Sequence, residues 1–126
     1  MRVLLRRYQE AMAFLHGATA SLPEDPLAFF RLGNAHFALE EYETASRMFF
    51  ESLKRCAPND TLLVKVHINM GISLESQDML AAAEREYCKA SRLAPNHPRV
   101  FKLLGSTRYA IRDYEGAVEA LGEAIK

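Results

Sequence analysis

Histidine and cysteine are the residues of this chain whose chemistry best suits metal binding or nucleophilic catalysis. The four histidines are spread along the sequence, at His16, His36, His67 and His97. None of them stands at a metal-ligand spacing from another histidine, a cysteine or a carboxylate on one helical face. Cys56 and Cys88 lack the C-x-x-C spacing of zinc and redox motifs. We therefore expect packing roles for these side chains, with no metal and no cofactor.

The common catalytic motifs are also missing from the sequence. It contains no G-x-S-x-G, H-E-x-x-H, G-x-x-x-x-G-K-[ST] or G-x-G-x-x-G pattern. Gly33, Gly71 and Gly105 stand alone within helical patterns, where a glycine costs about 1 kcal/mol relative to alanine. Isolated glycines of this kind indicate close helix packing and not a phosphate-binding loop. The sequence predicts no catalytic residue and no enzyme.

Composition narrows the possible partners and the compartment. The 126 residues carry 16 basic and 16 acidic side chains, so the net charge of zero argues against nucleic acid as a partner. No apolar run approaches the roughly 20 residues that span a bilayer, so we expect no membrane insertion. The apolar stretch at residues 3–5 is shorter than a secretory signal requires. With two cysteines outside any disulfide framework, we expect a cytoplasmic, reducing location.

An internal repeat of 34 to 38 residues organises the chain. Four alanines each precede a large apolar residue by four positions: Ala11/Leu15, Ala45/Phe49, Ala83/Tyr87 and Ala117/Leu121. Successive alanines are 34, 38 and 34 residues apart. A glycine lies 12 residues before each of the last three alanines, and prolines close the units at Pro23, Pro58 and Pro95. Because the alanines, the glycines and the prolines all recur at similar intervals, the pattern indicates a repeat architecture.

In these residues the chain resembles the tetratricopeptide repeat family, whose 34-residue helix–turn–helix unit has the pattern W-x2-L-G-x2-Y, A-x3-F, P. Three units match this pattern, at Phe29, Leu32, Gly33, His36, Ala45, Phe49 and Pro58, then at His67, Met70, Gly71, Leu74, Ala83, Tyr87 and Pro95, then at Phe101, Leu104, Gly105, Arg108, Ala117 and Leu121, where the third unit stops before its closing proline. Tryptophan is absent, and Leu74 and Arg108 replace the tyrosine. The resemblance covers nearly the whole chain. It implies an all-α, right-handed superhelical α-solenoid of about three and a half repeats and seven helices.

We expect a single domain over residues 1–126. Residues 1–25 are expected to supply half a repeat, the second helix only, before repeats at 26–59, 60–97 and 98–126, the last lacking its end. Helices are expected at 1–22, 26–38, 42–56, 61–76, 80–93, 98–111 and 115–126, with Phe49, Phe50 and Tyr87 in the core. The repeat at 60–97 holds about four extra residues, close to one helical turn. We predict that the helix from Thr61 begins one turn early, the alternative being a longer loop at 56–61.

The resemblance also implies a function, because the family binds a peptide or a partner helix in a concave groove lined by the first helix of each unit. Carried over position by position, the groove face comprises Leu27, Phe30, Asn34 and Phe37, then Lys65, Ile68, Asn69, Ile72 and Glu75, then Arg99, Lys102, Ser106 and Tyr109. Such a surface suits a ligand with a hydrophobic anchor and an acidic group. The expected role is a non-catalytic protein–protein interaction scaffold, as a fragment of a larger protein.

A more specific version is the carboxylate clamp of chaperone-binding members. The chain matches that clamp at Asn34, Asn69 and, more loosely, Arg99, whereas Phe30 and Leu103 replace two of its basic residues. Charge-assisted bonds to a carboxylate need those missing side chains, although Arg31 and Lys102 lie next to them. The clamp is therefore the weaker alternative.

A separate alternative concerns the last helix, which keeps Val118, Leu121 and Ile125 on one face with no later helix to cover them. Solenoids usually end in units with a polar outer face. Self-association through terminal helices is therefore an alternative function. Family members serve in many assemblies, including cytoskeletal, ciliary and flagellar ones, and the sequence does not select among them.

Overall fold

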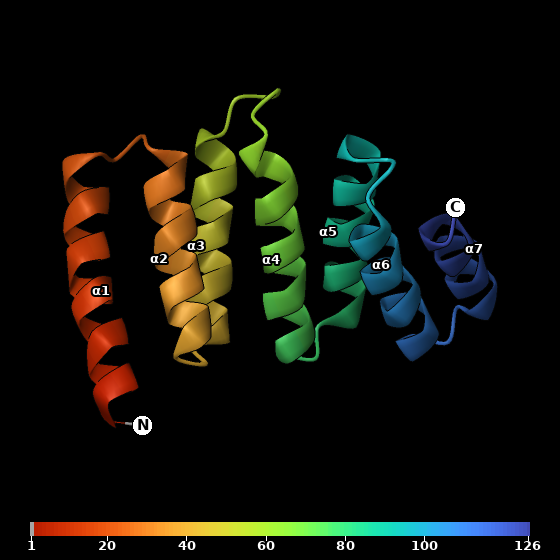
Figure 1. The fold of residues 1–126 in the computed structure, drawn as a ribbon, viewed down its shortest axis with the longest axis horizontal. Helices are drawn as coiled ribbons and strands as arrows, with labels where there is room; N and C mark the ends of the chain where they lie inside the picture. The colour runs from red at the N-terminus through yellow and green to blue at the C-terminus, as the bar shows by residue number, and fades with distance from the viewer. Residues whose placement is uncertain (1) are drawn as a thin grey trace.

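The computed structural model describes the backbone of residues 2–126 and the side chains of residues 6–126. The described chain forms seven helices and no strand: α1 (Arg2–Ser21), α2 (Pro26–Ala38), α3 (Tyr42–Arg55), α4 (Leu62–Ser76), α5 (Leu80–Leu93), α6 (Pro98–Ala110) and α7 (Tyr114–Ala124). They stand side by side in one row, in chain order (Figure 1). Met1, the start of the predicted half repeat, lies outside the described residues. None of the seven helices is long and apolar enough to cross a membrane.

The two helices of each unit are joined by the same tight turn. One residue of each turn adopts a positive φ: 61° at Glu40, 60° at Asp78 and 67° at Arg112. After the first turn, the backbone N–H of Glu41 donates to the carbonyl of His36 at 2.9 Å, and the other two turns repeat this bond. This is the Schellman arrangement, in which a left-handed residue satisfies the free carbonyls of a helix end. Glycine is the usual residue there, so the sequence predicted the places of the three turns between helices but did not indicate their positive φ.

The glycines of the repeat pattern permit the close approach of the two helices in each unit, as predicted. A Cβ added to Gly33 would stand 2.5 Å from Cε1 of Phe49, and one added to Gly105 would stand 2.7 Å from Cγ of Leu121. At Gly71 an added Cβ would overlap the ring of Tyr87 in the same way. The large residue of the A-x3-F pattern therefore rests in a notch that only glycine leaves open.

The core consists of layers that join successive helices. One cluster contains Ala45, Phe49 and Val66, so it links α3 of one unit to α4 of the next. Phe49 and Tyr87 are fully buried, as their spacing predicts. The prediction for Phe50 was wrong: its side chain is 50% exposed, with the Lys54 ammonium 5.2 Å from the ring centroid. One residue further along a helix turns by about 100°, which takes Phe50 out of the seam that holds Phe49.

The four extra residues of the middle repeat are divided between a helix and a loop. The helix α4 begins at Leu62, nine residues before Gly71, whereas α2 and α6 begin seven residues before their glycines. The connection from α3 to α4 has six residues (56–61), against four (22–25 and 94–97) in the two equivalent connections. Two residues therefore lengthen the helix and two lengthen the loop, so the predicted early start at Thr61 was only half right.

Candidate functional site

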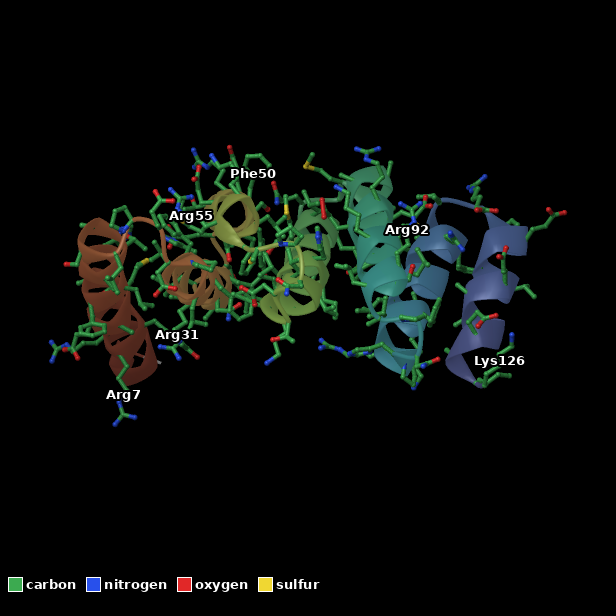
Figure 2. All side chains as sticks on the ribbon, turned by 90° about the horizontal axis from the view of Figure 1, so that it is seen from above. Arg7, Arg31, Phe50, Arg55, Arg92 and Lys126 are labelled. Atoms are coloured by element: carbon green, nitrogen blue, oxygen red, sulfur yellow. The ribbon has the colours of Figure 1, made fainter. Side chains whose placement is uncertain are left out.

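Within the row, the second helix α3 is displaced to one side of its first helix α2 (Figure 2). From above, Arg31 of α2 projects from one side of the row, whereas Phe50 of α3 projects from the opposite side (Figure 2). The first helices α2 and α4 contact each other directly, although α3 separates them in sequence. The face of the first helices is the one on which the groove was predicted.

Two adjoining hollows lie between these first helices. The first has a volume of about 200 Å³ and is lined by Asn34, Phe37, Phe49, Asn69, Ile72 and Arg99. The second has a volume of about 290 Å³ and is lined by Phe30, Val64, Lys65, Ile68, Asn69, His97 and Arg99. Asn69 and Arg99 belong to both linings, so the two hollows meet at these residues. We call the pair of hollows the groove.

The polar side chains that line the groove are cations, amides and one histidine, and neither lining contains a carboxylate. Lys65 and Arg99 are exposed, and neither forms an ion pair within the described part of the chain. Asn69 donates its side-chain amide to Oδ1 of Asn34 at 2.8 Å, which links α4 to α2 across the floor. Unpaired cations above an apolar wall attract an anionic group that brings its own apolar neighbour.

The structure brings eight of the thirteen predicted groove residues into these linings and leaves five outside: Leu27, Glu75, Lys102, Ser106 and Tyr109. Glu75 instead accepts a hydrogen bond from the Thr107 hydroxyl at 2.5 Å. The ring of Tyr109 packs edge-on against Tyr114, with ring centroids 5.4 Å apart. Phe49, Val64 and His97 line the groove without having been predicted. Phe49 lies on a second helix, Val64 in the first turn of α4, and His97 immediately before α6.

The predicted end face is exposed. Val118 is 72% and Ile125 86% exposed, and Leu121 is 43% exposed although part of its side chain fills the notch at Gly105. The spacing of three and seven residues places the three side chains on one face of α7.

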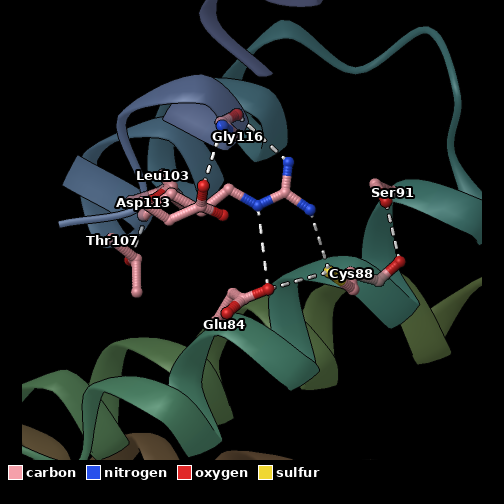
Figure 3. A network of polar contacts seen from close by, with 8 residues as sticks. Glu84, Cys88, Ser91, Leu103, Thr107, Asp113 and Gly116 are labelled. Carbon is pink, nitrogen blue, oxygen red and sulfur yellow. Dashed lines mark hydrogen bonds and ion pairs between the residues drawn. The ribbon is translucent and has the colours of Figure 1, made fainter. Parts of the chain in front are cut away.

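Cys88 takes part in a polar network that joins the last two units. Arg108 of α6 donates to Sγ of Cys88 at 3.6 Å and to the carbonyl of Gly116 at 3.2 Å, and its Nε lies 3.7 Å from Oε1 of Glu84 (Figure 3). The arginine at the usual tyrosine position therefore holds α5, α6 and α7 together. Cys88 is thus a hydrogen-bonding residue here and not only the small apolar residue expected.

Two histidines pair with carboxylates inside the helical hairpins. His67 is buried, and its Nδ1 lies 2.8 Å from Oε2 of Glu86, itself 7% exposed. Burial raises the pKa of Glu86, but the hydrogen bond and the charge of His67, with the charge of Lys89, outweigh it and hold this pKa below its usual value. His36 is buried as well, with its Nδ1 3.4 Å from Oε1 of Glu41. Across the described residues, no group of three or more His, Cys, Asp or Glu side chains is placed to hold a metal ion.

Comparisons with known proteins identify this arrangement. No family model matches the chain. An Arabidopsis thaliana protein, named as an uncharacterized TPR repeat-containing protein, is 34% identical over 103 residues, which are 79% of this chain. The chain spans 13% of the length of that relative.

Solved structures show the same fold. A structure titled MamA RS-1 ArsTM double mutant superimposes with a TM-score of 0.85 at 20% identity, over 98% of this chain and 67% of that one. A structure titled Crystal structure of MamA gives a TM-score of 0.86 at 18% identity, over 94% and 67%. The chain is a tetratricopeptide repeat protein. Its seven described helices form a right-handed superhelical α-solenoid, as the sequence predicted, and the family consists generally of interaction scaffolds.

Because of the buried Glu86–His67 pair, the free energy of unfolding of this tetratricopeptide repeat array should vary with pH in the acid range. Because the pKa of Glu86 is lower in the folded chain than its unfolded value of about 4.3, the pair stabilises the fold above that pH and loses its effect as pH falls through the folded pKa. At neutral pH, Glu86→Gln should reduce the free energy of unfolding by about 1–3 kcal/mol.

Urea unfolding from pH 7 down to about pH 3 tests this expectation. The difference between wild type and Glu86→Gln should shrink as the solution becomes acidic. Glu43→Gln, at an exposed position of α3, serves as the control and should differ little from wild type throughout. A Glu86→Gln difference that stays constant over the whole range would contradict the account.

Proposed function

We propose that the chain is a non-catalytic scaffold that binds a peptide or a partner helix in the groove. The observation that carries this proposal is the position of Arg99, an exposed cation without an ion pair among the described side chains, at the junction of the two hollows. An acidic group of a ligand at this point could reach Arg99 and Lys65 from one position.

The apolar linings define the rest of the ligand. Phe37 and Ile72 line the first hollow, and Phe30 and Ile68 line the second. Aromatic pockets with a neighbouring arginine are the typical centres of binding energy at protein interfaces. We infer a ligand that places an apolar side chain in a hollow and an acidic group between Lys65 and Arg99.

The same linings favour this ligand over a full carboxylate clamp. Asn34, Asn69 and Arg99 do line one hollow together, as the clamp requires. However, Phe30 supplies ring surface where a clamp has a lysine, and the Asn34–Asn69 hydrogen bond already occupies part of the amide capacity. A carboxylate would therefore receive fewer charge-assisted hydrogen bonds than a clamp provides.

Affinity capture of partners from a cell lysate, with matched arginine variants, tests the groove. Partners held by the wild-type chain should be lost with Arg99→Ala and with Asn34→Ala/Arg99→Ala, because both remove the anchor of the acidic group. Arg92→Ala is the control, since Arg92 is an exposed arginine that lines neither hollow. Binding should also weaken as salt concentration rises. Retention of every partner by the double variant would contradict the proposal.

The second candidate function is self-association through α7, which the exposure of Val118 and Ile125 favours. Two such faces packed together would remove apolar surface from water at about 25 cal/mol per Å². Light scattering should then show a mass that rises with concentration in the wild type and stays at the monomer value in Val118→Asp. A wild type that is monomeric at all concentrations would exclude this function and leave the groove.

We also propose a compartment and a general role for the chain. The free thiols of Cys56 and Cys88 support a reducing, cytoplasmic compartment. The repeat family of the chain supports a role in assembly and not in catalysis.

A further inference from the structure

We propose that His16 and His36 form a two-histidine site for a divalent transition-metal ion such as zinc, which fastens α1 to α2. Their spacing does not pair these residues, because they lie 20 positions apart on different helices. In the structure their ring centroids are 5.7 Å apart, with the ring planes at 80°.

His36 has the burial and hydrogen-bonding pattern of a metal ligand. It is 7% exposed, and its Nε2 is buried without a hydrogen-bond partner. Its other nitrogen, Nδ1, faces the Glu41 carboxylate at 3.4 Å, and a carboxylate can only accept. Nδ1 therefore carries the proton, which leaves the lone pair on the buried Nε2. Metal-binding histidines commonly have this arrangement, with the second nitrogen donating to a carboxylate.

His16 can supply the second ligand. Its ring is exposed, so it can turn to present a nitrogen toward His36. Imidazole nitrogens bind zinc at about 2.0–2.1 Å, which places the centroids of two rings on one tetrahedral ion roughly 5–6 Å apart. The observed 5.7 Å falls in this range, so only the ring of His16 would need to rotate and the helices would not have to move. Water would complete the coordination of zinc.

The site lies where the array is least firmly packed. No described side chain of α1 is buried, and α2 is its principal neighbour. A metal bridge between the two helices would stabilise the docked position of α1 by an amount set by the metal concentration and affinity. Metal binding would thus regulate whether α1, the half repeat, stays docked on α2. This regulation would not involve the groove.

Calorimetric titration of the metal-free chain with zinc chloride tests the site. We expect binding of one zinc ion per chain, with an affinity about tenfold or more weaker in His16→Gln. Because His16 is exposed, this variant should retain the fold even if His36→Gln does not. Glu43→Gln, which removes an exposed carboxylate of α3 that lines neither hollow, is the control and should bind zinc like the wild type.

Thermal unfolding with zinc or with a chelator gives a second readout. Zinc should raise the unfolding midpoint of the wild type and of Glu43→Gln but not that of His16→Gln. The site would be overturned if the wild type binds no zinc, as expected if Nε2 of His36 only rests against the His16 ring. Equal zinc affinity in the wild type and His16→Gln would overturn it as well.

Discussion

The close contact between a glycine of one helix and a large side chain of the next is the constraint on which this structure depends. Phe49, Tyr87 and Leu121 each rest against a helix surface that has no Cβ at the point of contact. A glycine within a helix costs about 1 kcal/mol relative to alanine, so each glycine is retained against helix propensity. In return, the notch buries Phe49 and Tyr87 completely and holds the two helices of the unit at a small separation. Packing density in the hairpin therefore outweighs the local preference of the backbone.

The arrangement of the first helices follows from that constraint. Once each second helix lies close against its own first helix, the next unit can pack on it, as in the cluster of Ala45, Phe49 and Val66. The first helices α2 and α4 then contact each other on one side of the row. The groove opens there, and the Asn34–Asn69 hydrogen bond joins the two helices at its floor. The binding surface is thus built from residues far apart in sequence that the repeat brings to one face.

Periodicity within a helix made much of this predictable. The helix bounds, the three glycine notches and the burial of Phe49 and Tyr87 all follow from spacings in one unit. Features that depend on neighbouring helices did not follow. The spacing of one helix could not show that His16 meets His36, or that Glu75 bonds Thr107 and lines neither hollow. The conformation of the turns did not follow either, since Glu40, Asp78 and Arg112 adopt positive φ without being glycine.

A double-mutant cycle on Gly33 and Phe49, followed by urea unfolding, tests the central claim most directly. In the wild-type background, Gly33→Ala should lower the free energy of unfolding, because the new Cβ would stand 2.5 Å from the Phe49 ring. In a Phe49→Ala background the ring is gone, so the same substitution should raise the free energy of unfolding by up to about 1 kcal/mol through helix propensity. An effect of the same sign and size in both backgrounds would contradict the account.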